Sequence, residues 1–219
     1  MERDTIKNAI LKGFETSKEL GGLSNKLKSA LFVQLVCASL CDQSKESNLF
    51  PICQKVRVDG TGKDSGEWLL DAIIAEKVVI PEKIKGKKDS QHEFNTNLEW
   101  AIESEYNTSL KEFLADFSKL LVINSKNKLY LNGYASLNLN SFKLYRDNRL
   151  ERAAHLVKDY NSNKGEFYFA FWPNPQKKKF PRSNMYDSFW AIIDTPEHHG
   201  LLEAITEVYK FSNGEFKRL

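Results

Sequence analysis

Residues 98–106 read LEWAIESEY and place three glutamates in a stretch that otherwise has the pattern of a half-buried β-strand. Trp100 and Ile102 alternate with their neighbours, as in a strand with one apolar face. Glu103 and Glu105 then point to the same side, about 7 Å apart at ~3.4 Å per residue. Carboxylates held so close repel each other unless a positive group lies between them. The pattern therefore raises the question of which cation, from the chain or from solution, lies beside this strand.

The first part of the chain combines helical and strand-like patterns. Apolar residues at helical spacing predict a helix over residues 2–20 and a second, largely buried helix from residue 24 or 25 to about residue 44. Residues 52–58 (ICQKVRV) and 68–74 (WLLDAII) are strand-like and flank the glycine-rich turn DGTGKDSG. This pattern is typical of a β-hairpin.

The polar, lysine-rich residues 81–97 begin with proline, and we expect them to form a long loop. After the strand at 98–106, Thr108 or Ser109 can cap a helix, because hydroxyl groups accept hydrogen bonds from the first turn. Six apolar residues of this helix form one stripe, which predicts that it packs on a sheet: Leu110, Phe113, Leu114, Phe117, Leu120 and Leu121.

The last third of the chain carries further strand and helix patterns. Residues 128–134 (KLYLNGY) predict a strand and residues 140–160 a charged amphipathic helix. The aromatic runs 166–172 and 188–194 predict two more strands. Residues 201–211 are expected to close the chain as a helix.

In the middle of the chain the predicted order is helix, three strands, helix and strand. We expect a single α/β domain over residues 1–219 with a mixed sheet, in which the first three strands form a meander. The core would span residues 25–135. The N-terminal helix 2–20 and a C-terminal extension over 139–219 with extra strands and a helix would be added to it.

Composition places few limits on the function. A hydrophobic content of 41% with 28% charged residues is ordinary for a soluble globular protein. The sequence has neither an apolar stretch long enough to span a bilayer nor an evident signal peptide, so we expect a cytoplasmic protein without membrane contact. A net charge of +3 permits a nucleic-acid partner without requiring one. Cys37 and Cys41, one helical turn apart among apolar residues, are expected to be buried thiols.

An aspartate in the second predicted strand supplies another carboxylate for the cluster. Asp71 is costly if buried alone in a strand, and pairing of the second and third strands can bring it to Glu103, with Glu105 at the edge. Mg²⁺ or Mn²⁺ would resolve the repulsion, because these ions prefer hard oxygen ligands. Asp71 could instead be a strand-end residue that bonds an amide, and the glutamates could line a solvated sheet face.

These residues resemble the motif of the PD-(D/E)XK nuclease superfamily, whose members have a restriction-endonuclease-like core. The matching stretches are GEWLLD (66–71), Glu103-Ser104-Glu105 and DFSKLL (116–121), and the resemblance covers roughly residues 25–135. It implies an αβββαβ core in which Asp71 and Glu103 bind Mg²⁺ or Mn²⁺. It further implies that the Ser104 carbonyl group or Glu105 completes the metal shell.

The sequence departs from that motif at one important position. The lysine that usually follows the glutamate by two residues is replaced by Glu105. Some members move this lysine to the following helix, and Lys119 is the residue that could take its role here by orienting water or stabilising charge. Lys119 could equally be a solvated lysine of an amphipathic helix.

Two basic runs could contact nucleic-acid phosphates, Lys83–Lys88 and Lys177–Arg182. Charge runs are also common in solvated loops. The residues we name as nucleic-acid contacts are Arg57, Lys87, Lys88, Lys177, Lys178, Lys179 and Arg182.

Together these features predict a divalent-metal-dependent nuclease with catalytic residues Asp71, Glu103, Glu105 and Lys119. Its substrate would be nucleic acid, with DNA expected, and a homodimer is compatible with the sequence. The alternative is a nuclease-fold module that has lost the chemistry and binds nucleic acid or a protein, as Glu105 in the lysine position would suggest. A small-ligand-binding α/β domain is a third interpretation, with no motif behind it.

Overall fold

A seven-stranded mixed sheet forms the centre of the protein, as a computed structural model shows. The structure describes residues 2–19, 25–44, 48–53, 70–82, 90–105, 109–134, 138–160, 165–173, 195–196 and 200–219. None of the helices in these ranges is long and apolar enough to cross a membrane.

The strands lie in the sheet in their order along the chain. The first three pair antiparallel as a meander, β4 runs parallel to both β3 and β5, and the last two strands return to antiparallel pairing. The strands are β1 (Leu49–Cys53), β2 (Ala72–Glu82), β3 (Ser90–Glu105), β4 (Asn127–Tyr134), β5 (Glu166–Pro173), β6 (Glu207–Ser212) and β7 (Glu215–Arg218).

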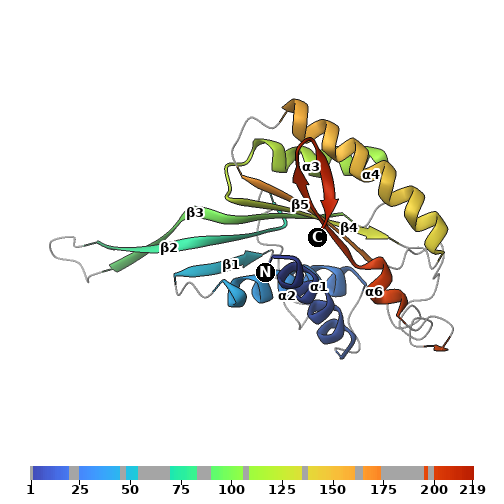
Figure 1. The fold of residues 1–219 in the computed structure, drawn as a ribbon. Helices are drawn as coiled ribbons and strands as arrows, with labels where there is room; N and C mark the ends of the chain where they lie inside the picture. The colour runs from blue at the N-terminus through green and yellow to red at the C-terminus, as the bar shows by residue number, and fades with distance from the viewer. Residues whose placement is uncertain are drawn as a thin grey trace.

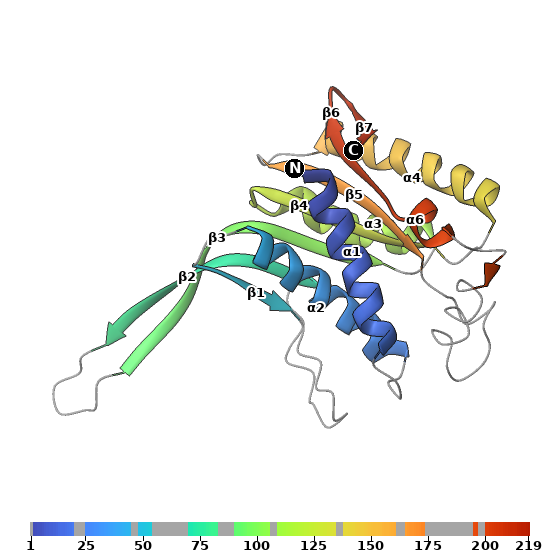
Figure 2. The same ribbon diagram turned by 60° about the horizontal axis from the view of Figure 1, so that its bottom comes forward.

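Helices cover both faces of the sheet. Figure 1 shows α1 and α2 on one face and α3 and α4 on the other, and the turned view in Figure 2 agrees. A short helix, α6, leads into β6. The helices are α1 (Glu2–Glu19), α2 (Asn25–Gln43), α3 (Leu110–Val122), α4 (Leu139–Tyr160) and α6 (Leu201–Ile205).

Each face has its own hydrophobic core. Under α1 and α2, Phe32 contacts Phe14 and Trp172, with its ring centroid 4.7 Å and 4.3 Å from theirs. Gly13 lets the two helices approach, because a Cβ there would lie 3.2 Å from Val36. Under α3, Phe117 contacts Tyr130 of β4 with ring centroids 5.4 Å apart. Fully buried aromatic residues therefore fix both helical layers against the sheet.

Most of the predicted elements are confirmed within the described residues. The helices begin and end within one or two residues of the expected positions for α1, α2, α3 and α4, and the strands do so for β4 and β5. The meander is confirmed. The Oγ of Ser109 accepts a hydrogen bond from the N–H of Glu112, so Ser109 is the N-cap of α3. Cys37 is a buried free thiol, whereas Cys41 is only half-buried.

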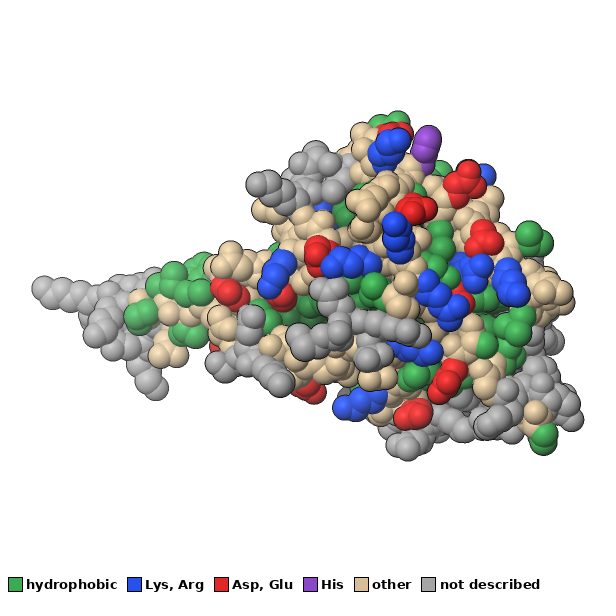
Figure 3. All heavy atoms as spheres, viewed as in Figure 1, with side chains coloured by type: hydrophobic (Ala, Val, Ile, Leu, Met, Phe, Trp, Pro, Cys, Tyr) green, Lys and Arg blue, Asp and Glu red, His purple; other side chains and the backbone are tan. Residues whose placement is uncertain are grey.

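The expected loop over 81–97 is wrong. Its described residues belong to β2 and β3, which continue as a two-stranded arm that extends beyond the rest of the sheet (Figure 1). Val78 pairs with Phe94 on this arm, and Lys77 forms an ion pair with Glu93. Both faces of the arm are open to solvent, so polar and apolar residues need not alternate, and the strand pattern is hidden. Figure 3 shows exposed hydrophobic side chains gathered on the arm.

The expected helix over 201–211 is also wrong beyond residue 205. Helix α6 ends at Ile205, and β6 and β7 follow as a hairpin. Its turn contains Asn213 and Gly214, both with positive φ (53° and 86°). Asn-Gly at such a turn favours a tight hairpin whose twist matches the strands. The turn signal therefore outweighs the helical spacing of the apolar residues before it.

Two strand boundaries also differ from the prediction. The first strand is Leu49–Cys53 rather than 52–58, and residues 54–58 lie outside the described ranges. The second strand begins at Ala72, one residue after Asp71, rather than at residue 68. The predicted strand at 188–194 lies outside the described residues.

We predict that Phe117→Ala lowers the free energy of unfolding by about 3–5 kcal/mol, because Phe117 is fully buried under α3. The matched change Phe94→Ala on the arm should cost about 1 kcal/mol or less, since Phe94 is 48% exposed. Urea denaturation of both variants measures the difference. Equal losses would contradict the described packing.

Candidate functional site

The strand register brings Asp71 and Glu103 together. Ala72 pairs with Ile102 in the β2–β3 ladder, and one further step places Asp71 opposite Glu103. The backbone N–H of Ser104 donates a hydrogen bond to Asp71 Oδ2 (2.8 Å). Asp71 is therefore a strand-end residue that bonds an amide, as the alternative interpretation expects. It also lies opposite Glu103, as the expected pairing of the two strands requires.

Helix α3 brings a lysine to the same place. Lys119 Nζ lies 3.3 Å from Glu103 Oε2 and 2.9 Å from Asp116 Oδ1. Asp116 and Lys119, three residues apart, lie beside the buried stripe of α3, so the helix directs them toward the end of β3. The ammonium group of Lys119 is therefore a positive partner for the strand carboxylate.

The Glu103 carboxylate is buried and only half satisfied. Its side chain is 1% exposed, and within the described part of the chain Oε1 has no hydrogen-bond partner. Tyr130 is paired with Glu103 across β3 and β4, and its hydroxyl group likewise has no partner among the described residues. Buried polar atoms usually have partners, so these two atoms on neighbouring strands are candidates to contact a water molecule or an ion.

Burial shifts the charge balance of this site. Desolvation, with a further contribution from the negative charge of Asp71, raises the pKa of Glu103 to about 8, although Lys119 opposes the change. Burial lowers the pKa of Lys119, but the hydrogen bond from Lys119 to Asp116 and the charge of Glu103 outweigh it, so the net pKa is raised. Lys119 is therefore protonated at neutral pH. Its positive charge lowers the pKa of Glu103 but does not return it to the ordinary value.

Glu105 and Ser104 extend the site along β3. Glu105 lies two residues beyond Glu103, on the same side of the strand, and is half-buried. Burial raises the pKa of the Tyr130 phenol, and the negative charges of Asp116 and Glu105 raise it further. The N–H and C=O groups of a strand residue point to the same neighbour. The Ser104 carbonyl group therefore points to the side on which Asp71 lies.

The ligand atoms at this site are of the type that a hard divalent cation prefers, but the described part of the chain offers fewer side-chain ligands than such an ion usually has. Asp71, Glu103 and the Ser104 carbonyl group offer oxygen atoms, which such ions prefer. Within the described residues no group of three or more His, Cys, Asp and Glu side chains is arranged to hold a metal ion. A cation bound here would therefore rely on two carboxylates, backbone oxygen and water.

The predicted nucleic-acid contacts cannot be placed, because all seven lie outside the described residues: Arg57, Lys87, Lys88, Lys177, Lys178, Lys179 and Arg182. On the face shown in Figure 3, basic and acidic side chains are interspersed over the body of the molecule. The charge pattern of this face agrees with the small net charge of +3.

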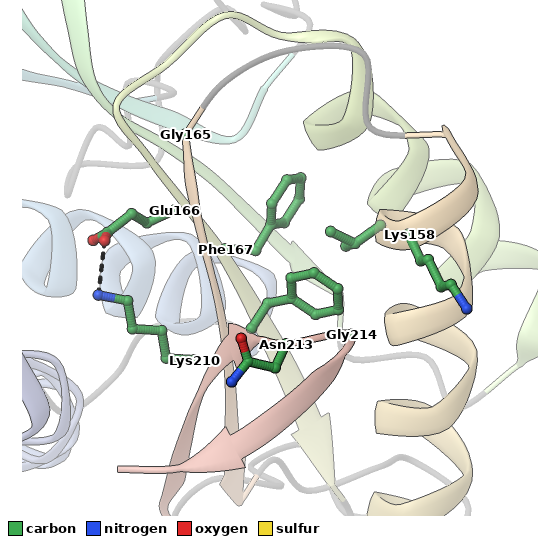
Figure 4. A pocket seen from close by; sticks show the side chains of 9 residues that line it. Lys158, Gly165, Glu166, Phe167, Lys210, Asn213 and Gly214 are labelled. Carbon is green, nitrogen blue, oxygen red and sulfur yellow. Dashed lines mark ion pairs between the residues drawn. The ribbon is translucent and has the colours of Figure 1, made fainter.

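A separate pocket of about 680 Å³ lies at the amino end of β5, two strands away from β3. Phe167 and Phe211 line it, as do Asn213 and Gly214 of the β6–β7 turn. In Figure 4, Lys210 points away from the rings and forms an ion pair with Glu166 (2.8 Å). Two charged residues of this pocket are thus paired with each other, and none of its lining residues belongs to the acidic site.

The chain matches no protein family, no curated protein and no solved structure in the comparisons made.

Sequence reasoning missed two residues of the site. Asp116 enters the sequence analysis only as part of the stretch DFSKLL, and Tyr130 only as part of the strand predicted over residues 128–134. The spacing of Asp116 and Lys119 is a detectable signal, because oppositely charged residues three apart on a helix commonly pair. Nothing in the local sequence marks the Tyr130 hydroxyl group as lacking a partner.

We predict that stability falls between about pH 4.5 and pH 8 because of Glu103. Its pKa in the folded state is about 8, against 4.5 in the absence of burial, so over this range the folded protein binds more protons than the unfolded chain. Stability contributed at low pH is then lost as the pH rises. Glu103→Gln should flatten this part of the stability curve, as measured by urea denaturation at several pH values. An unchanged slope in the variant would contradict the burial of a protonated carboxyl group.

Proposed function

We propose that this protein is a divalent-metal-dependent nuclease with a restriction-endonuclease-like core, which hydrolyses phosphodiester bonds of nucleic acid, with DNA the expected substrate. The element order supports the core: α2, an antiparallel meander of β1, β2 and β3, then α3 and a parallel β4. This is the αβββαβ order that the motif resemblance implies.

The observation that carries the proposal is the carboxylate pair at the start of β2 and the end of β3, in which Glu103 is buried and Asp71 is half-buried. Asp71 lies opposite Glu103 in the extended register, and Glu103 Oε1 has no partner among the described residues. Lys119 stands at 3.3 Å without restoring an ordinary pKa to Glu103. A second, stronger cation is the simplest group that would stabilise both carboxylates in their charged forms.

Each residue of the site has a role in the proposed reaction that follows from its chemistry. Asp71 and Glu103 would hold the cation together with the Ser104 carbonyl group, and Glu105 could bind one of its water molecules. When bound, a divalent cation polarises the phosphoryl oxygen and lowers the pKa of water. Lys119 remains protonated, so it would stabilise negative charge on the phosphate rather than accept a proton.

The second candidate function is a nuclease-fold module without activity that binds nucleic acid or a protein. The ion pair between Lys119 and Glu103 favours it, because this contact already places one cation beside the buried carboxylate. Glu105 in the position of the usual lysine points the same way.

We predict that Asp71→Asn abolishes Mg²⁺-dependent cleavage of DNA and leaves the melting temperature unchanged or higher. Asparagine keeps an oxygen that can accept the Ser104 N–H bond, and it removes a negative charge next to Glu103. Cleavage of a labelled plasmid and a thermal melt measure the two effects. Full cleavage by a folded Asp71→Asn variant would refute the proposed role of Asp71.

A metal titration separates the two candidate functions. We predict that millimolar Mn²⁺ raises the melting temperature of the wild-type protein, since a ligand that binds only the folded state stabilises it. The shift should disappear in Glu103→Gln. The highest Mn²⁺ concentration should be about 10 mM, several times the dissociation constant of a typical weak site. If the melting temperature of the wild-type protein does not rise even there, the inactive module is favoured.

A further inference from the structure

The ammonium group of Lys119 is shared by two carboxylates from different elements. Glu103 belongs to β3 and is fully buried, whereas Asp116 belongs to α3 and is 21% exposed. The contact to Asp116 is the shorter, at 2.9 Å against 3.3 Å. Because Asp116 and Lys119 are one turn apart on the same rigid helix, their contact does not depend on the sheet.

A cation between Asp71 and Glu103 would compete with Lys119 for the same carboxylate. Lys119 holds Glu103 Oε2, and the oxygen without a partner among the described residues is Oε1, so a cation on Oε1 would lie close to the ammonium group. Two positive groups on one carboxylate repel each other, and this repulsion favours movement of the ammonium group away from Glu103. If Lys119 had no other anion, it would be left as an uncompensated charge in a half-buried position, which is costly. Asp116 gives it an anion that it already contacts.

Lys119 also has to remain near the site after the cation enters. A lysine side chain is flexible and would otherwise turn toward water. The bond to Asp116 limits this freedom and keeps the charge within reach of a phosphate bound between β3 and α3. Effects of this kind, in which one side chain fixes another that acts on the substrate, are commonly large.

We propose that Asp116 is a positioning residue, which holds Lys119 beside the acidic pair and receives its ammonium group when a divalent cation binds Asp71 and Glu103. This inference rests on the proposed function, because it assigns a role within the same site. It explains how a lysine carried by a helix can stand in for the lysine that is replaced on β3 by Glu105.

The experiment is a double-mutant cycle on metal binding, read from Mn²⁺ titrations of the melting temperature rather than from cleavage. The variants are Asp116→Asn, Lys119→Met and the double variant. Glu112→Gln serves as the matched control, since it removes one negative charge from the same helix one turn earlier. Gln is also suitable at this position after the Ser109 cap.

Asp116→Asn is expected to weaken Mn²⁺ binding about tenfold in the wild-type background. In the Lys119→Met background, Asp116→Asn should reduce the Mn²⁺ affinity clearly less, because there is no ammonium group for Asp116 to hold. Glu112→Gln should change the affinity by less than about twofold. A simple loss of negative charge would instead act equally in both backgrounds, or more strongly when Lys119 is absent.

Cleavage provides the second readout. Asp116→Asn should lower kcat about tenfold or more with little change in KM, and Asp116→Glu should restore part of the rate. Additive effects of Asp116→Asn and Lys119→Met on Mn²⁺ affinity would overturn the positioning role and leave the nuclease proposal standing. If the wild-type protein binds no Mn²⁺, the proposed function fails, and the role of Asp116 fails with it.

Discussion

The buried carboxylate of Glu103 is the constraint on which the site depends. An ionised carboxylate removed from water is expensive, and here burial and the nearby Asp71 push it toward its protonated form, raising its pKa to about 8. The fold tolerates this side chain because α3 places Lys119 beside it. A residue that costs stability in this way is more readily explained by chemistry than by folding.

The architecture explains how these groups meet. Strand β3 is paired on both sides, antiparallel to β2 and parallel to β4, so its residues are held firmly at the end where Glu103 lies. The crossover from β3 to the parallel β4 requires a helix on one face of the sheet. That helix is α3, whose aromatic residues pack on β4 and β5 and fix its rotation. The position of Lys119 follows from that rotation.

The sequence was informative where a single period dominates. Strict alternation around Trp100 and Ile102 located β3, and the apolar stripe with the Ser109 cap located α3. The sequence pattern gave a wrong prediction where helix and turn signals compete, or where both faces of a strand are open to solvent. The arm of β2 and β3 has no buried face to impose alternation. The residues after Ile205 keep a helical spacing, although the Asn213–Gly214 turn makes them a hairpin.

The paired carboxylates and the lysine of the site were predictable from the sequence, whereas the roles of Asp116 and Tyr130 and the contacts within the site were not. Pairing of neighbouring strands was enough to bring Asp71 to Glu103. Spacing alone did not decide whether Lys119 faces the sheet or solvent, because it lies at the border of the apolar stripe. The missing partner of Glu103 Oε1 arises from packing between β3, β4 and α3, and no local pattern encodes it. The basic runs outside the described residues stay predictions.

The most direct test of the account is the structure of a crystal soaked with Mn²⁺, in which anomalous scattering locates the ion. We predict one Mn²⁺ bound by carboxylate oxygens of Asp71 and Glu103, with Lys119 moved from Glu103 toward Asp116. An empty acidic pair with Lys119 still in contact with Glu103, or an ion bound only elsewhere, would contradict it.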